Sequence, residues 1–566
     1  MKKQWVMRAI DRDYVPSFAE TLSISPITAA VLLGRGVADP SQARQWMSAS
    51  QATWHDPFLL PDMERAVDRV NKAIQAKERI CFYGDYDVDG ISATSLHLSF
   101  FRGEGAEAEV YIPDRQSEGY GLNEQAIRHL ASNGVKVLLT ADCGTTSHHE
   151  VEVANHLGLD VIVTDHHQIQ EHFPPALAFL NPQRADSQYP FQGLCSGGIA
   201  YKFVEAYALK YGCHARPVQE YRDLVALSSI ADVVPLLDEN RYLVREGLGL
   251  LTNGTRCGVR ALKQCLGITG PCTASTVGFR LAPVINAAGR LAHARLGVKL
   301  LTTDSDIEAL QLAKQLEGLN RERRQIEQDM FHEAVALVQH RSSPSAIVVG
   351  VQGWHVGVIG IVASRLVERY HKPAVVIAFD SQGVGKGSLR SIPGIDVCQA
   401  LADCRDSVVG FGGHPAAAGV TLHLDQLERF NEKFCDAVAS RMTADHSVPI
   451  LDVDAHVQLR DVHPLLVREL EQLHPYGMGN PEPTLMAEGL TVLEKRVVGD
   501  NHLKVVVRQS QSVPIEGIGF RMGEFGDMLD QTRQQVDMAF IPEVSRWKGY
   551  DRMQLRIRDL RISQSV

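Results

Sequence analysis

Acidic and imidazole side chains recur in a few short motifs within the first half of this 566-residue sequence. Three aspartates alternate in Gly84-Asp-Tyr-Asp-Val-Asp-Gly90, Asp142 stands in Ala-Asp-Cys-Gly, and Asp165 is followed by His166 and His167. The first motif is a poor match to a calcium loop, because that loop needs flanking helices and a ligand glutamate at its twelfth position. Any one motif alone is also typical of a solvated turn or a helix cap.

The combination is more specific than its parts. Carboxylate oxygens and imidazoles without thiolates suit Mn²⁺, allow Mg²⁺ and argue against a structural zinc. Two such cations about 3.5–4 Å apart can hold both the attacking and the leaving oxygen of a phosphoryl displacement. The sequence therefore predicts metal-dependent phosphodiester cleavage at a centre built from Asp87, Asp89, Asp142, His166, His167 and Asp232.

The elements around these motifs predict how they meet. Short apolar runs that precede the motifs alternate with helical segments, which favours βαβ units and a mostly parallel sheet. Ligands of such sheets bind at the carboxyl ends of the strands, where most of the predicted centre falls. Strands are expected at 79–83, 108–112, 135–139 and 160–163, and helices at 91–101 and 123–133.

The rest of the chain predicts three further regions of an α/β protein. A charged segment at 304–340 is expected to form one long helix, about 50 Å in length, that joins two domains. Strand–helix alternation resumes after it, and the last region reads as short strands typical of an OB-type β-barrel. The expected parts are an N-terminal helical lead-in, a catalytic domain, a connecting segment, a substrate-binding domain and the barrel, at 1–50, 51–270, 271–344, 345–445 and 446–566.

Composition excludes few functions. The formal net charge of -10 does not by itself indicate nucleic-acid binding, but that binding depends on local basic grooves. The ten cysteines include no CxxC pair, which favours a reduced, cytoplasmic protein. No apolar run follows the N-terminal lysines and no stretch of 18 uncharged apolar residues occurs, so neither a secretion signal nor a membrane span is expected.

Several motifs together resemble the DHH phosphoesterase superfamily, and the rest of the chain is similar to its RecJ branch of single-stranded-DNA-specific 5′→3′ exonucleases. The similarity covers nearly the whole chain, and 345–445 resembles the DHHA1 substrate-binding domain. The motifs that carry it include GDYDVDG, ADCG, TDHH, SIADVVP, YIPDR, EGYG, FRLAPVINAAGR, GKGSLRS, GGHPAAAG and PYGMGNPEP.

The resemblance implies a role for each residue of the centre. Asp142 is expected to bridge the two cations, and His167 to face the substrate, where it stabilises the phosphate or assists proton transfer. Asp165 would orient the two histidines, and Asp85 would support the site from outside the ligand set. The implied metal ligands are Asp87, Asp89, Asp142, His166 and Asp232.

The resemblance also implies contacts to the substrate. Arg115, Ser388 and Arg390 are expected to bind a terminal 5′-phosphate, because guanidinium groups suit bidentate phosphate contacts. Arg280 and His355 are expected to contact the strand further along. His414, beside Gly412 and Gly413, would donate to the same anion, although glycine-rich turns account for both glycine motifs equally well. The segment Arg546-Trp-Lys-Gly-Tyr550 could stack and attract single strands, or form an ordinary hairpin.

The function implied is hydrolysis of single-stranded DNA from its 5′ end to 5′-mononucleotides, in DNA repair and recombination. Single-strand-binding protein and a helicase are the implied partners, and a monomer is expected. Three alternatives stay open at this point: hydrolysis of short oligonucleotides, cyclic dinucleotides or pyrophosphate, a non-catalytic replication scaffold, and a generic single-strand-binding protein. The barrel argues against the first, and the intact carboxylates and histidines argue against the other two.

Overall fold

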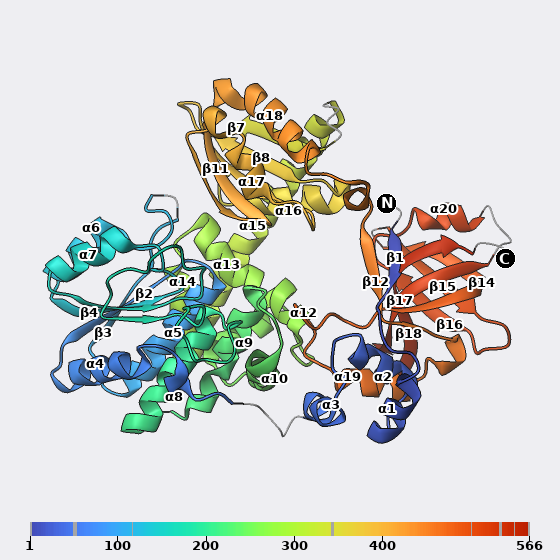
Figure 1. The fold of residues 1–566 in the computed structure, drawn as a ribbon, viewed down its shortest axis with the longest axis horizontal. Coiled ribbons are helices and arrows are strands. Elements are labelled where there is room, and N and C mark those ends of the chain that lie inside the picture. Colours follow the sequence, from blue (N-terminus) through green and yellow to red (C-terminus); the bar gives the residue numbers. More distant parts are fainter. Residues whose placement is uncertain are drawn as a thin grey trace. The chain divides into compact units, whose positions relative to one another are not determined.

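The computed structural model describes residues 3–48, 54–115, 117–214, 216–340, 345–499, 501–530, 535–547 and 550–563. The chain forms two compact units. One is continuous, from Trp54 to Ser447, and the other combines Met1–Thr53 with Val448–Val566 (Figure 1).

The larger unit begins with a five-stranded parallel sheet of order β3-β2-β4-β5-β6. Alternate side chains of β2 enter two different cores: Ile80 and Phe82 pack on one face, and Cys81 and Tyr83 on the other. The parallel α/β sheet predicted from the sequence is confirmed, with β6 as an additional short strand. The strands are β2 (Arg79–Gly84), β3 (Ala108–Tyr111), β4 (Val135–Ala141), β5 (Asp160–Thr164) and β6 (Ala178–Leu180).

Helices cover both faces of this sheet (Figure 1). One face packs on α4, α5 and α8, and the other packs on α6 and α7. From β2 the chain passes to β3 on one side and then to β4 on the other, so the strand order reverses between β2 and β4. This reversal opens a crevice at the strands' carboxyl ends. The helices are α4 (Met63–Gln75), α5 (Val88–Gly103), α6 (Glu124–Ser132), α7 (His148–His156) and α8 (Ser196–Tyr211).

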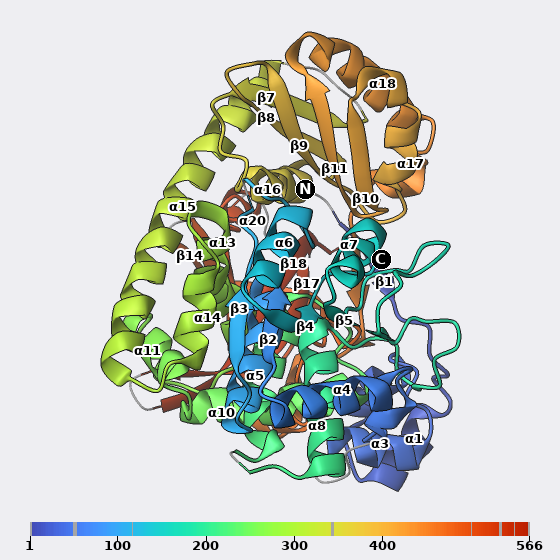
Figure 2. The same ribbon diagram turned by 90° about the vertical axis from the view of Figure 1, so that its left-hand side faces the viewer.

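A helical layer follows and ends in the predicted long helix. This helix, α15, spans Asp306–His340. Its first half packs against α11, α13 and α14, and its second half buries Met330, Phe331 and Ala334 against the next sheet. In Figure 2 it runs along one side of the unit. The preceding helices are α9 (Arg222–Ala231), α10 (Asp238–Asn253), α11 (Cys257–Cys265), α13 (Ala282–Leu291) and α14 (Arg295–Thr302).

The second sheet of the larger unit has the order β10-β11-β9-β8-β7, and only β7 and β8 are parallel. Both glycine-rich motifs lie in strands. GKGSLRS falls largely in β9, and GGHPAAAG forms the β10–β11 hairpin. The elements are β7 (Ile347–Gln352), α16 (Ile359–Tyr370), β8 (Ala374–Phe379), β9 (Val384–Arg390), α17 (Val397–Ala402), β10 (Gly410–His414), β11 (Ala417–His423) and α18 (Leu427–Ala439).

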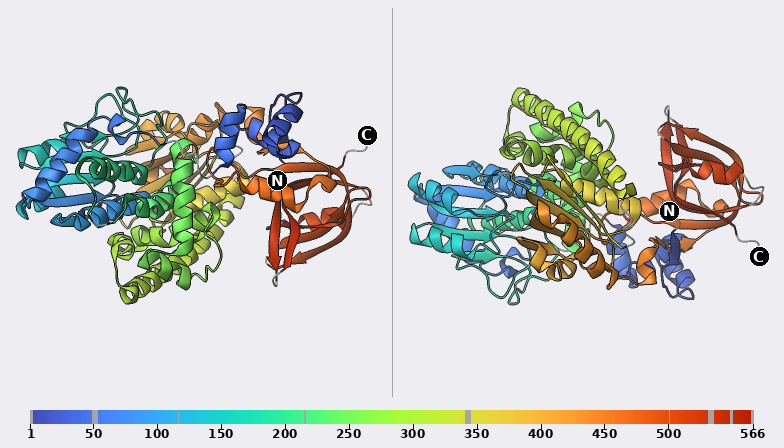
Figure 3. Two further views of the ribbon diagram at one scale, coloured as in Figure 1. Left: turned by 90° about the horizontal axis from the view of Figure 1, so that it is seen from below. Right: turned by 90° about the horizontal axis from the view of Figure 1, so that it is seen from above.

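The smaller unit contains the predicted barrel. Five strands pair in the order β14-β15-β16-β18-β17, and a β14–β17 pairing closes the ring (Figure 3). The strands are β14 (Leu485–Val498), β15 (His502–Arg508), β16 (Ile515–Gly519), β17 (Val536–Trp547) and β18 (Tyr550–Ile562). The predicted stacking segment lies at the β17–β18 turn. Lys548 and Gly549, with the side chains around them, lie outside the described residues.

The N-terminal segment belongs to this smaller unit. Phe18, Ala29 and Leu32 are buried in one core with barrel residues, and strand β1 pairs in parallel with β12. The sequence did not indicate this association, because the two segments are separated by about 400 residues. The elements are β1 (Gln4–Met7), α1 (Val15–Leu22), α2 (Pro26–Leu33), α3 (Pro40–Met47), β12 (Ile450–Val453) and α19 (Pro464–Glu471).

No single helix among the described residues is long and apolar enough to cross a membrane, and only the bent pair α1 and α2 passes that test by length and composition.

Candidate metal centre and anion pocket

The aspartates after β2 are held by two helix N-termini. Asp87 caps α5 by accepting hydrogen bonds from the backbone N–H of Asp89 (2.9 Å) and of Gly90 (3.1 Å). Asp89 accepts from the backbone N–H of Ser196 (2.9 Å) and Gly197 (2.8 Å), which open α8. Helix N-termini favour negative charge, so the backbone stabilises both carboxylates at this point.

Asp142 lies on the neighbouring strand end and completes the crevice. It follows β4 with φ of 70°, a left-handed conformation that turns the chain sharply. Its Oδ1 accepts a hydrogen bond from Ser196 Oγ (3.0 Å), and the Tyr120 hydroxyl donates to its carbonyl (3.0 Å). The carboxylate is almost fully buried.

His166 faces three of the predicted carboxylate ligands. Its Nε2 lies 3.3 Å from Asp142 Oδ1, 3.5 Å from Asp232 Oδ2 and 3.7 Å from Asp89 Oδ2. This buried nitrogen has no hydrogen-bond partner among the described residues. A buried polar atom of this kind needs a partner, and a cation between the ring and the carboxylates would supply one.

Asp165 orients the adjacent histidine. Its Oδ1 accepts from the backbone N–H of His166 (2.8 Å) and lies 2.7 Å from His167 Nδ1, and its Oδ2 accepts from the backbone N–H of Thr145 (3.0 Å). Burial opposes the charge on His167, but the bond to Asp165 and the nearby carboxylates raise the pKa of His167 to about 9. Burial would raise the pKa of Asp165, but the contacts with His167 and Thr145 and the charge of His166 outweigh it and hold this pKa below the usual value.

The pKa values of the other carboxyl groups show that the cluster carries surplus negative charge. Burial, followed by repulsion from neighbouring aspartates, raises the pKa of Asp85, Asp87 and Asp142. The same causes raise the pKa of Asp232 to about 9. Like charges this close cannot all ionise without a compensating cation, so the residues fit a divalent metal centre.

Three overlapping groups of side chains have ligand atoms within 4.8 Å of one another. Asp142 belongs to two of them, as expected of a carboxylate shared by two neighbouring cations. His166 also belongs to two, and its Nε2 can ligate one cation. His167 and Asp85 also belong to one group each, so the geometry is compatible with direct ligation by either. The groups are Asp142, His166 and His167; Asp89, His166 and Asp232; and Asp85, Asp87 and Asp142.

A cationic pocket lies in the same unit. The Arg115 guanidinium stacks over the Tyr86 ring at 4.8 Å, and Arg390 lies near enough for the charge of Arg115 to act on it. Burial, and then repulsion by Arg115, lowers the pKa of Arg390; burial and the neighbouring guanidiniums lower the pKa of Arg290 to about 10. Arg115, Ser388 and Arg390 line one cavity of about 590 Å³. Guanidiniums that cluster without a carboxylate ion pair among the described residues favour binding of an anion such as phosphate.

The remaining predicted substrate residues do not line this cavity. Arg280 is exposed and donates to the Leu266 carbonyl. His355 is half-buried and accepts from the Gly357 backbone N–H (3.1 Å). His414 is exposed at the end of β10. Their substrate contacts stay predictions.

Several residues of the site were given no role from the sequence. The side-chain amides of Asn181 and Gln183 donate to the carbonyls of His167 (2.9 Å) and His166 (2.5 Å). Arg290 joins the cationic pocket from α13 and donates to the Gly357 carbonyl (2.8 Å). Asn181 and Gln183 directly follow β6, so recognising that short strand would have placed them at the same sheet edge as the histidines.

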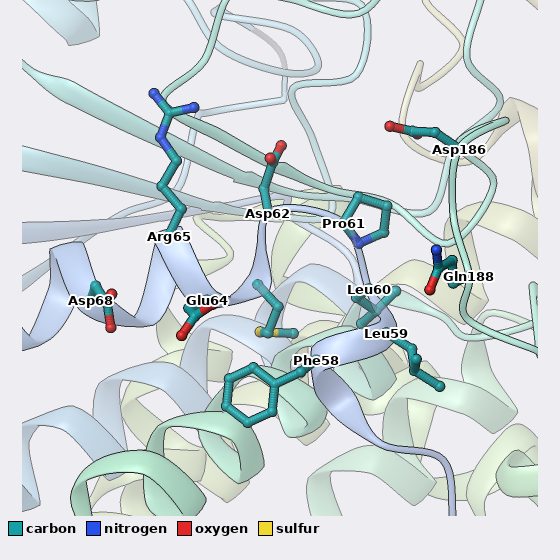
Figure 4. Close-up of a pocket in the computed structure, with 11 residues that line it drawn as sticks. Phe58, Leu59, Leu60, Pro61, Asp62, Glu64, Arg65, Asp68, Asp186 and Gln188 are labelled. Atoms are coloured by element: carbon teal, nitrogen blue, oxygen red, sulfur yellow. The ribbon is translucent and has the colours of Figure 1, made fainter.

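A second cavity has a volume similar to that of the anion pocket but a different balance of charges. It measures about 620 Å³ and lies at the start of α4 (Figure 4). Its aspartates are neutralised within the protein: Asp62 and Asp186 pair with Arg184, at 2.6 and 2.7 Å, and Asp68 pairs with Lys210 at 2.6 Å. It has neither the carboxylate surplus of the metal centre nor the cation surplus of the anion pocket.

The fold and the site define a phosphoesterase of the DHH class. Residues 79–229 match the model of the DHH family, N-terminal domain, and 343–440 match the DHHA1 domain. The crowded carboxylates lie in the first region or just after it, and the cavity with Ser388 and Arg390 lies at the second. The family resemblance and the fold class inferred from the sequence are thereby confirmed.

The particular family follows from the full-length matches. Residues 453–559 match the RecJ OB domain. The RecJ single-stranded-DNA-specific exonuclease of Bacillus subtilis is 36% identical over 100% of this chain and 71% of its own length, and that of Salmonella typhimurium is 32% identical over 99% and 100%. This chain belongs to the RecJ family.

Solved structures agree with this assignment. The crystal structure of RecJ from Thermus thermophilus in complex with Mn²⁺ matches with a TM-score of 0.85 at 28% identity, over 100% of this chain and 80% of that one. The Mg²⁺ complex from the same organism matches with a TM-score of 0.78 at 27% identity, over 99% and 79%.

Proposed function

We propose that this protein hydrolyses single-stranded DNA from its 5′ end and releases 5′-mononucleotides. The observation that carries the proposal is the presence, in one compact unit, of a carboxylate–histidine metal centre and a separate cationic pocket. The first suits cleavage of a phosphodiester, and the second suits a terminal phosphate. Membership in a family of single-stranded-DNA-specific exonucleases supports the same substrate.

Two divalent cations, Mn²⁺ or Mg²⁺, are the proposed cofactors. Asp87, Asp89, Asp142, His166 and Asp232 would hold them, with Asp142 shared. When bound, the cations would neutralise charge on the reacting phosphoryl group and orient its oxygens. Ser196 and the α5 and α8 N-termini hold the carboxylates in position, as the hydrogen bonds above indicate.

His167 is proposed to act on the substrate. Its Nδ1 lies against Asp165, which leaves Nε2 free to face the phosphate. In the metal-free protein the pKa of His167 is about 9. The contact with Asp165 favours the protonated ring, which can donate an N–H to a phosphoryl oxygen. Asp165 is then a positioning residue, because it sets the orientation and the charge of that ring.

The terminal 5′-phosphate is proposed to bind Arg115, Ser388 and Arg390. Ser388 Oγ accepts from Arg390 Nη1 (3.0 Å), so the serine holds the guanidinium in place. Space for the anion depends on Gly360, because a Cβ there would come within 3.1 Å of both Ser388 Oγ and Arg390 Nη2. Binding the 5′ end here would leave the first internucleotide bond for the metal centre.

The barrel is proposed to help load single strands. Its outer face bears a groove of about 1080 Å³ that combines cationic and apolar side chains. Extended single strands are bound by such mixtures of charge and stacking surface. The residues that line it include Arg460, Arg496, Arg552, Val513 and Met553, together with Lys504, which pairs with Glu516 at 2.6 Å.

The cellular setting is also a proposal. A cytoplasmic, monomeric enzyme that acts in DNA repair and recombination fits the family. Single-strand-binding protein and a helicase are the proposed partners. Pull-down of each purified partner with the purified enzyme would test the two contacts directly.

One assay tests the proposal as a whole. The enzyme, supplied with Mn²⁺ or Mg²⁺, is given a 5′-phosphorylated, 3′-labelled single strand, the matching duplex and a dinucleotide. Progressive shortening of the single strand from its 5′ end, with release of mononucleotides, is expected. Cleavage of the dinucleotide alone would favour a small-molecule phosphodiesterase, and binding without cleavage would favour a scaffold.

A further inference from the structure

The sheet face around Ser388 carries three parallel rows of residues. The strand registers of β9, β11 and β10 place Arg390 beside Ala417 and His414, Ser388 beside Gly419 and Gly412, and Lys386 beside Thr421 and Gly410. Residues two apart in a strand share one face, so all three rows face the same side. The cavity of about 590 Å³ touches all three rows.

In the middle row, Gly412 and Gly419 have no side chains that cover the backbone. A Cβ added at Gly412 would meet nothing within 4 Å, and one at Gly419 would meet only carbonyl oxygens at 3.9 Å. The opposite face is closely packed, because a Cβ at Gly387 would lie 2.7 Å from Val420 Cγ1. The open floor therefore belongs to the cavity and not to the core.

The cavity extends past the proposed 5′-phosphate position. Arg115 marks the end nearest the metal centre, because its guanidinium stacks over the ring of Tyr86, which stands between Asp85 and Asp87 in the chain. Lys386 lies four residues before Arg390 in β9, roughly 13 Å along the strand. Lys386 is exposed and has no ion pair among the described residues. One phosphate needs far less than this cavity, whose volume is typical of sites for larger ligands.

We propose that the part of the cavity between Ser388 and Lys386 binds the additional phosphates of a 5′-polyphosphorylated strand end. This inference rests on the proposed function. Lys386 supplies a cation, Thr421 supplies a hydroxyl donor, and Gly412 with Gly419 leaves room for the phosphate chain. The backbone N–H groups of β9 and β11 contribute little, because both strands are hydrogen-bonded to a neighbour on each side.

The chemistry of cleavage is unchanged in this proposal. Water adds to the phosphorus of the first internucleotide bond, the bond from that phosphorus to the 3′ oxygen of the terminal nucleotide breaks, and a proton goes to that oxygen. The anhydride bonds of the 5′ end stay intact. The first product is then a nucleoside 5′-triphosphate, and every later product is a 5′-mononucleotide.

The test compares two oligodeoxynucleotides of one sequence, with a 5′-monophosphate or a 5′-triphosphate, on the full-length enzyme with Mn²⁺. We expect both to be shortened and the triphosphorylated strand to release one nucleoside triphosphate, identified by chromatography. K386Q should lower kcat/KM on the triphosphate about three- to fivefold relative to the monophosphate, as expected of one exposed cation. K386E should lower that ratio further.

A matched control is K433Q on α18, where Lys433 pairs with Asp406 at 2.6 Å; it should leave the ratio unchanged. The inference is overturned if the triphosphorylated strand is not cut, or if K386Q and K386E lower both rates equally. Failure to cut the monophosphorylated strand would instead refute the proposed function.

Discussion

The metal centre and the anion pocket both crowd buried groups of like charge, negative in the metal centre and positive in the pocket. In the first, buried aspartates raise one another's pKa; in the second, Arg115, Arg290 and Arg390 crowd together and the pKa of the latter two falls. The cavity at the start of α4 has as much volume, yet its charges pair internally. Uncompensated like charge, and not volume, therefore distinguishes the metal centre and the anion pocket from this cavity.

The largest effect is expected from a substitution of Asp142 in the metal centre. Asp142→Ala removes the carboxylate common to two of the three ligand groups, so turnover should fall by about 10³-fold or more. Steady-state kinetics on a 5′-phosphorylated single strand measures this. Glu171→Ala, an exposed carboxylate in the same domain, is the control and should retain activity. If Asp142→Ala keeps an activity within tenfold of wild type, the assignment of Asp142 as a metal ligand is wrong.

A substitution in the anion pocket should change KM for the substrate. Arg390→Met should raise KM for a 5′-phosphorylated strand about 10- to 100-fold, because a charge-assisted phosphate contact is lost. A 5′-hydroxyl strand should be affected far less. Arg429→Met, at an exposed arginine paired with Asp406, is the matched control. Equal losses on both strands would contradict a role in recognising the 5′-phosphate.

Substitution of Asp165 tests whether this residue sets the protonation of His167. Asp165→Asn should reduce kcat about tenfold or more, as expected for a partner that orients a reacting group. It should also lower the pKa of His167, because the main contact that raises this pKa to about 9 is removed. The alkaline limb of the pH–rate profile should shift to lower pH. A fall in activity with an unchanged profile would assign Asp165 a purely structural role.

The smallest effect concerns stability without metal. Asp232→Asn should raise the Tm of the metal-free enzyme by about 1–3 °C at neutral pH. Burial and the neighbouring aspartates raise the pKa of Asp232 to about 9, so its carboxyl must take up a proton on folding at neutral pH, a cost in stability that asparagine avoids. Mn²⁺ should then stabilise the variant less than the wild type. Calorimetry with and without Mn²⁺ measures both. A lower Tm for the metal-free variant would show that the cluster is not under electrostatic strain.

His167 adds a pH dependence to the metal-free stability. Its pKa is raised on folding from 6.5 to about 9, so the folded state binds the proton more tightly. The stabilisation from the Asp165–His167 pair is fully present below about pH 6.5 and is lost as the pH rises through about 9. Asp165→Asn should flatten the dependence of Tm on pH across that window.

The sequence predicted what short-range patterns encode. Apolar runs located four strands of the first sheet, and the strand-end position of Asp142 and His166 indicated that they meet. It did not reveal β6, which is three residues long, and so missed Asn181 and Gln183. Long-range pairing could not be predicted either, since Arg290 enters the pocket from a helix. The segment of β9 was left open between an anion contact and a glycine turn, because two of the three residues on its core side, Gly385 and Gly387, are glycines.

The association of the N-terminal segment with the barrel has a consequence for biosynthesis. Phe18 and Leu32 are buried in a core that also contains residues beyond Val448. About 400 residues separate the two parts, so at typical synthesis rates the first helices emerge roughly 20–80 s before their partners. During that interval their apolar faces are open to chaperones or to aggregation, and the smaller unit can complete its fold only after the catalytic unit has been made.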